Sequence, residues 1–91
     1  MMRTAHRIEL RWVPHCPNVD RVRQALYDVM AELEIGIDVV EERVGDYASP
    51  TVVVDGLDVI TRKLPRPGAA CRLDLPTRAQ LIDALRPPGA R

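Results

Sequence analysis

Residues 8–22 read IELRWVPHCPNVDRV and predict a strand, a break and the start of a helix. Apolar and charged residues alternate from Ile8 to Val13, which is the period of a half-buried strand. Two prolines then interrupt the strand. The second, Pro17, suits the first helical position, because an amide proton has no partner there. We therefore expect Cys16 at the N-cap of the helix.

The residues that follow predict the helix and a second strand. Apolar residues recur every three or four positions from Val19 to Leu33, as in an amphipathic helix. Gly36 can end this helix, and the β-branched residues of 37–44 predict a strand. A strand–helix–strand crossover is almost always right-handed and joins parallel strands, so this unit begins an α/β layer.

A hairpin is predicted next. Residues 51–54 read TVVV and residues 57–60 read LDVI, and Asp55-Gly56 between them is a strong two-residue turn signal. Residues 45–50 form only a short break before the hairpin. The sequence thus predicts four strands, with a helix between the first and the second.

The C-terminal third predicts a long connection and a short helix. Residues 61–75 have no clear period, which is typical of a functional or mobile connection. Thr77 and Gln80 have the spacing of a capping box and open a helix that ends before Pro87. We expect residues 87–91 to be a disordered tail.

Composition limits the classes of function. The 91 residues fit one domain, and 46% hydrophobic with 29% charged residues is ordinary for a globular chain. The 13 basic and 13 acidic residues are interspersed, which argues against a nucleic-acid partner. No apolar run is long enough to span a membrane and no leader pattern is present, so we expect no membrane partner and a cytoplasmic location.

Cys16 is the best candidate for a reactive group. A helix N-terminus stabilises a thiolate, which is the nucleophilic form of cysteine. His15 could add positive charge or move a proton, and Trp12 stands just before the turn, where it could contact a substrate. The alternatives are an inert, packed Cys16, a His15 that is an ordinary loop side chain and a Trp12 that belongs to the core.

From Ile8 to Leu85, the predicted order of strands and helices resembles the core of thioredoxins and glutaredoxins. Cys16-Pro17 opens the first helix and Ser49-Pro50-Thr51 opens the third strand. The resemblance implies an α/β fold of the reduced thioredoxin-like type, β-α-β-β-β-α, with a four-stranded mixed sheet in the order second, first, third, fourth strand. It also implies both helices on one face and a cis-proline at Pro50 beside Cys16.

The sequence is also similar to small thioredoxin-like proteins, some of them labelled alkylmercury lyase. Those proteins carry Gly-Cys-Pro-Asn, Ser-Pro-Thr and Cys-Arg-Leu segments. The matching residues here are 15–18, where His15 replaces the glycine, 49–51 and 71–73. Two departures stand out: Val19 occupies the place of the usual resolving cysteine, and the helix usually found between the second and third strands is missing.

The missing helix predicts that one face of the sheet is uncovered. Polar residues on the first strand agree with this, and apolar neighbours would leave room for a homodimer or another partner. The residues expected on this face are Glu9, Arg11, Val13, Val40, Thr51, Val53 and Asp55.

Cys71 follows the fourth strand, which in this sheet order runs parallel to the first. Its connection therefore leaves the sheet at the edge where Cys16 lies. The ten residues 61–70 can cross the distance of two strand spacings, so a Cys16–Cys71 disulfide is within reach. A packing role for Cys71, without a disulfide, is an equally good interpretation.

Three functions follow. In the first, Cys16 performs thiol–disulfide exchange or thiol capture with a protein or a low-molecular-weight thiol, Cys71 resolves the intermediate, and Pro50 and Ser49 contact the substrate. In the second, the chain is a non-catalytic protein-binding module. In the third, the two thiols bind a soft metal or an organomercurial, although no ligand pair has the spacing of a metal site. We expect no cofactor and no resident metal.

Overall fold

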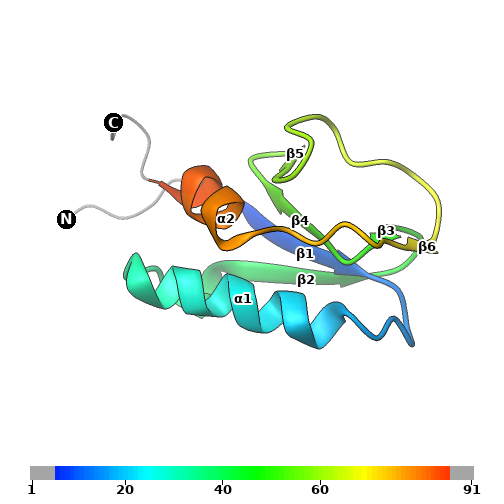
Figure 1. Ribbon diagram of the computed structural model, residues 1–91, viewed down its shortest axis with the longest axis horizontal. Helices are drawn as coiled ribbons and strands as arrows, with labels where there is room; N and C mark the ends of the chain where they lie inside the picture. Colours follow the sequence, from blue (N-terminus) through cyan, green and yellow to red (C-terminus); the bar gives the residue numbers. More distant parts are fainter. Residues whose placement is uncertain (1–5, 87–91) are drawn as a thin grey trace.

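A four-stranded mixed sheet forms the centre of the computed structural model, which describes residues 6–86 (Figure 1). The order is β2-β1-β4-β5, with β2 parallel to β1, β4 antiparallel to β1 and β5 antiparallel to β4. The predicted strand order is therefore confirmed. The strands are β1 (Ile8–Trp12), β2 (Val40–Val44), β4 (Thr51–Val54) and β5 (Leu57–Asp58). The tail predicted to be disordered, residues 87–91, lies outside the described residues.

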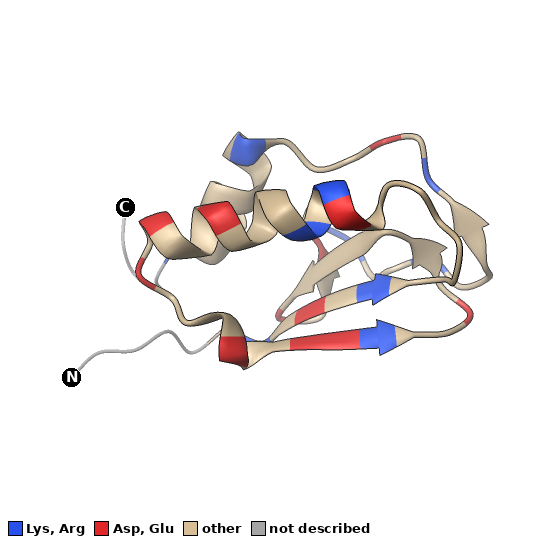
Figure 2. Ribbon diagram, turned by 90° about the horizontal axis from the view of Figure 1, so that it is seen from below, with Lys and Arg blue, Asp and Glu red and all other residues tan. Residues whose placement is uncertain are grey.

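Helices α1 (Val19–Glu32) and α2 (Arg78–Leu85) pack on one face of this sheet, as predicted. Leu10 of β1, Leu26 of α1 and Leu81 of α2 are all 0% exposed and belong to one core cluster. Figure 2 shows α1 lying along the β1 and β2 side of the sheet. The capping box at the start of α2 is present, with Thr77 and Gln80 bonded reciprocally. No helix among residues 6–86 is long and apolar enough to cross a membrane.

The start of α1 differs from the prediction. The N-cap is Asn18, so Cys16 lies two residues outside the cap and Pro17 is not the first helical residue. The amide of Val19 bonds to the carbonyl of Cys16 at 3.5 Å, which makes a turn, and the helical ladder begins only with Val22 N donating to Asn18 O at 3.1 Å. Cys16 is therefore held by this turn and does not cap the helix.

Three strand ends also differ. Val13 leaves β1 because its amide donates to the Ser49 side chain. The first residues of the predicted 37–44 strand form a short 3-10 helix, η1 (Ile37–Val39). β5 ends at Asp58, whose carboxylate accepts a hydrogen bond from the Ile60 amide at 2.8 Å and turns the chain.

A second, two-stranded sheet lies at one end of the first. β3 (Ala48–Ser49) pairs in parallel with β6 (Ala70–Cys71), and the long connection after β5 arcs over to reach it (Figure 1). This small sheet was not predicted. In chain order, β3 occupies the segment between β2 and β4, which contains no helix. Its pairing with β6 brings Cys71 back to the main sheet.

The face opposite the helices is uncovered only in part, which corrects the prediction. The β2 side chains Glu41 and Arg43 are 57% and 42% exposed, whereas positions on β1 and β4 are covered. Glu9, Thr51 and Val53 are only 7%, 2% and 0% exposed. Acidic positions of β1 and β2 lie next to each other, and so do basic ones (Figure 2), while Glu9 forms ion pairs with both Arg11 and Arg43.

Of the other residues predicted on this face, Val40 needs correction and Arg11 does not. Val40 is opposite Ile8 in the register and packs into the core, so it lies on the helix side of the sheet. The guanidinium of Arg11 lies 5.1 Å from the centre of the Tyr47 ring. Ion pairs and side chains from neighbouring segments therefore cover much of the face on which a homodimer was expected.

Candidate functional site

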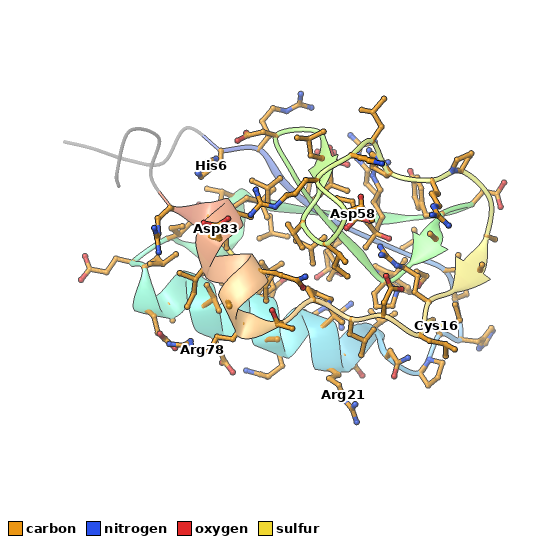
Figure 3. All side chains as sticks on the ribbon, turned by 45° about the horizontal axis from the view of Figure 1, so that its top comes forward. His6, Cys16, Arg21, Asp58, Arg78 and Asp83 are labelled. Carbon is orange, nitrogen blue, oxygen red and sulfur yellow. A yellow bond between two sulfur atoms is a disulfide. The ribbon has the colours of Figure 1, made fainter. Side chains whose placement is uncertain are left out.

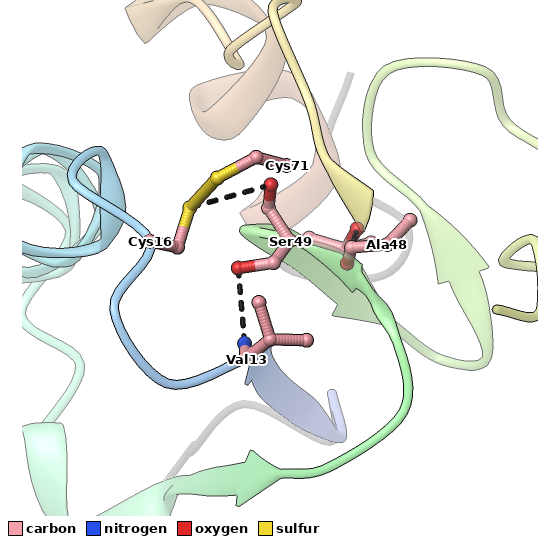
Figure 4. The surroundings of a disulfide bond; sticks show 6 residues. Val13, Cys16, Ala48, Ser49 and Cys71 are labelled. Atoms are coloured by element: carbon pink, nitrogen blue, oxygen red, sulfur yellow. Dashed lines mark hydrogen bonds between the residues drawn. A yellow bond between two sulfur atoms is a disulfide. The ribbon is translucent and has the colours of Figure 1, made fainter. Parts of the chain in front are cut away.

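The two cysteines meet at one end of the sheet. Figure 3 places Cys16 at the far end of the molecule from His6 and Asp83. There Cys16, from the turn before α1, and Cys71, from β6, form a disulfide with a Cα–Cα distance of 6.1 Å (Figure 4). This distance is within the ordinary range for a disulfide. The predicted proximity of the two cysteines, 55 residues apart, is confirmed.

Ser49 links the segments that carry the cysteines. Its hydroxyl oxygen accepts a hydrogen bond from the Val13 amide at 3.1 Å, and its carbonyl accepts one from the Arg72 amide at 2.6 Å. The Sγ atom of Cys16 lies 3.7 Å from the same carbonyl oxygen (Figure 4). Ser49 is also the register partner of Cys71. One buried residue thus joins the end of β1, the Cys16 turn and β6.

Pro50 follows directly, and the Ser49–Pro50 peptide bond is cis. Both residues are buried, and Ser49 pairs with Cys71 of β6 next to the disulfide. In this closed form their side chains are packed inside the protein. The sequence predicts a substrate contact at Ser49 and Pro50, and a contact at the backbone edge of Ser49 requires β6 to move.

Among the contacts of residues 6–86, none joins His15 or Trp12 to the sulfur atoms of the two cysteines. His15 is exposed, in a turn with φ of 69°. Trp12 packs against the core, where its indole N–H donates to Glu42 at 3.2 Å and Arg23 lies 5.7 Å from its ring. The core alternative is therefore the better description of Trp12.

A buried ion pair beside Cys71 was missed. The side chains of Arg72 and Asp58 are only 11% and 6% exposed, and they are joined by a hydrogen bond of 2.7 Å. The same Arg72 nitrogen donates to the Thr51 hydroxyl at 3.0 Å, and Thr51 donates to the Ala48 carbonyl at 2.7 Å. Arg72 also pairs with Asp74 at 2.7 Å. This network ties the residue after Cys71 to β4 and β3.

Electrostatics in the network favour the charged forms. Hydrogen bonds to Asp74 and Asp58 raise the pKa of Arg72 above its ordinary value, against the effect of burial. The Arg72 guanidinium in turn lowers the pKa of Asp74. The sequence held one signal of this network: Asp58 stands between Leu57 and Val59 in a strand, and a buried carboxylate needs a cation.

A cavity of about 270 Å³ adjoins this network. It lies between the long connection and the ends of β3, β5 and β6. Its wall consists of Ala48, Asp58, Thr61, Arg66, Pro67, Gly68, Ala70, Cys71, Arg72 and Asp74. Within residues 6–86 no group of three or more His, Cys, Asp or Glu side chains could hold a metal ion.

The scan against protein-family models finds no match, and neither does the search of curated proteins or that of solved structures. The fold shown by the structure is mixed α/β with a four-stranded mixed sheet and two helices on one face.

Proposed function

We propose that the chain is a small thioredoxin-like protein in which Cys16 and Cys71 cycle between dithiol and disulfide. One observation carries the proposal: the only two cysteines of the sequence come together at the same end of the sheet. They come from segments far apart in the chain, so the pairing is a property of the fold and not of local sequence.

Exposure and position support a reactive role. Cys71 is exposed and Cys16 is partly buried, so an external thiol can reach the bond. Cys16 does not cap α1, but it lies two residues before the N-cap, toward the positive end of the helix dipole, which favours a thiolate. When the bond is open, Cys16 is therefore the better nucleophile, and the Ser49 carbonyl lies close enough to accept a hydrogen bond from the thiol form.

Atoms and electrons balance in the proposed cycle. The Cys16 thiolate attacks one sulfur of a substrate disulfide; the substrate S–S bond breaks and one substrate thiolate leaves and takes up a proton. Cys71 loses its proton and attacks the Cys16 sulfur of the mixed disulfide, and the second substrate thiolate leaves and is protonated in turn. The dithiol has then lost two electrons and two protons, and the substrate has gained them.

Movement of β6 belongs to this cycle. In the closed form β6 pairs with β3 through the Ala70 and Arg72 amides and occupies the backbone edge of Ser49. Opening the disulfide removes the covalent tie on a two-residue strand, which is too short to be stable by itself. A substrate backbone then takes the place of β6 beside Ser49.

The test uses the reduced chain and a neutral probe, bis(2-hydroxyethyl) disulfide, followed by acid trapping and mass spectrometry. The wild type should end as the Cys16–Cys71 disulfide. The Cys71→Ser variant should stop at a mixed disulfide on Cys16, and Cys16→Ser should react much more slowly. Equal rates for Cys16→Ser and the wild type, or no mixed disulfide on Cys71→Ser, would contradict the proposal.

A further inference from the structure

The outer edge of β2 is open. β2 is the first strand of the sheet, and Figure 2 shows no other described segment along its outer side. At the opposite edge, β5 has only two residues, and the Asp58 amide is already bonded to the Lys63 carbonyl. An open strand of five residues is a template for pairing with another strand.

The backbone groups that face this edge can be identified. The Gly45 amide donates to the Trp12 carbonyl at 3.1 Å, so the groups of Gly45 point toward β1. Successive residues of a strand direct their N–H and C=O groups to opposite sides. The groups of Glu41 and Arg43 therefore also face β1, and those of Val40, Glu42 and Val44 face the open edge.

The sequence of this strand, VEERV, is complementary to itself in the antiparallel direction. With a two-fold axis at Glu42, Val40 faces Val44 of a second copy, and these outward-facing residues form the hydrogen-bonded pairs. Glu41 then faces Arg43 of the second copy at a non-hydrogen-bonded pair, where side chains are closest. Hydrogen bonds, apolar contacts and charges all agree on one register.

We propose that two copies of the chain pair through β2 about a two-fold axis at Glu42 and so form one continuous sheet. The exposed apolar residues at this edge support the proposal. Val44 is 54% exposed, and the pairing places it beside Val40 of the second copy. Val39, which is 44% exposed, lies at the same junction. A closed two-fold contact also removes the open edge from further association.

The two Glu42 residues do not prevent this pairing. Each Glu42 carboxylate accepts hydrogen bonds from Arg23, Trp12 and Tyr27 of its own chain. Its charge is therefore directed toward α1 and compensated by the Arg23 guanidinium. The charges that face the second copy across the close pairs belong to Glu41 and Arg43. These two also pair with each other within the chain at 2.9 Å, so the dimer joins two such pairs into one network of alternating charge.

The test is sedimentation equilibrium of the full chain, from about 1 µM to about 1 mM, a range that covers weak and moderate association. The first variant is Glu41→Arg, which sets a second cation against Arg43 of the other copy. The second is the exchange Glu41→Arg/Arg43→Glu, which restores opposite charges. We expect a wild-type dimer, a Kd raised roughly tenfold by Glu41→Arg because two symmetric pairs turn repulsive, and recovery in the exchange. Electrophoresis without reductant confirms that the dimer is not covalent.

The exchange also protects the test against misfolding. Positions 41 and 43 are the register partners of Glu9 and Arg11, so the exchanged side chains meet opposite charges within the same chain. A second readout is amide exchange in the wild type: protection of Val40, Glu42 and Val44 should rise with protein concentration. A wild type that is monomeric at about 1 mM, or a Glu41→Arg variant that associates as the wild type does, would overturn the proposal.

Discussion

The two faces of the sheet both hold buried residues but cover them by different means. On the helix side, Leu10, Val52 and Leu26 are covered by other apolar side chains. On the other side, Glu9 is covered by arginines, and Thr51 and Asp58 by the Arg72 side chain. Apolar burial spreads over many contacts, whereas each polar contact is directional. The comparison indicates that the core sets the stability of the fold, and that a few polar pairs set the position of Cys71.

The largest effect should come from the apolar face. Leu26→Ala removes a side chain that is 0% exposed and should lower the free energy of unfolding by about 3 kcal/mol. Urea unfolding, with the disulfide intact in both proteins, measures this loss. The position of Cys71 should be unchanged, so the equilibrium constant for the disulfide should stay the same. A large fall in that constant in this variant would contradict the separate roles of the two faces.

The next effect should come from the ion pair beside Cys71. Asp58→Asn leaves the buried Arg72 with one carboxylate fewer and should cost about 2 kcal/mol. Because Arg72 follows Cys71, the equilibrium constant for the disulfide against glutathione should fall several-fold as well. The matched control is Asp83→Asn, whose partner Arg62 is exposed. A disulfide equilibrium unaffected by Asp58→Asn would sink the assigned role of Arg72.

A smaller effect should follow acidification. Hydrogen bonds from Arg23, opposed by burial, and the bond from Tyr27 lower the pKa of Glu42 from 4.5 to about 2. Its contribution is present above pH 4.5 and is lost as the pH falls toward 2. Solvent screening reduces it to on the order of 1 kcal/mol. Urea unfolding over this pH range should show a flatter profile for Glu42→Gln than for the wild type, and identical profiles would contradict this.

The smallest effect should be that of the exposed Arg62–Asp83 pair, far from the site. Both side chains are about half exposed, so Arg62→Gln should change the free energy of unfolding by less than about 0.5 kcal/mol. The same unfolding measurement applies. A loss as large as that of Asp58→Asn would show that burial does not separate the two ion pairs.

Much of the fold could be predicted because its signals are local. The period of residues 8–12, the apolar stripe of α1, the Asp55-Gly56 turn and the Thr77 capping box each specify one element. The ends of these elements depend on contacts that the hydrophobic period does not show. Val13 turns toward Ser49, 36 residues away, and the Asp58 carboxylate accepts a hydrogen bond from the Ile60 amide inside a stretch with the composition of a strand.

The candidate site could be predicted in part. The resemblance to thioredoxins implies Pro50 beside Cys16, and the sheet order it implies, with the length of the connection, brings Cys71 to the same edge. The β3–β6 pairing was not expected, since strands of two residues have no period. Arg72 was noticed only as part of a motif, because its partners Asp58 and Thr51 are neighbours in space and not in sequence.

The most direct test of the central claim is the redox equilibrium of the two cysteines. The chain is equilibrated in glutathione buffers of increasing ratio, from the oxidised and from the reduced side, trapped with acid and mapped without reductant. The account predicts one reversible two-electron transition, with the same midpoint from both sides, between free thiols and the Cys16–Cys71 peptide pair. A bond that never forms, or one that no glutathione ratio opens, would contradict it.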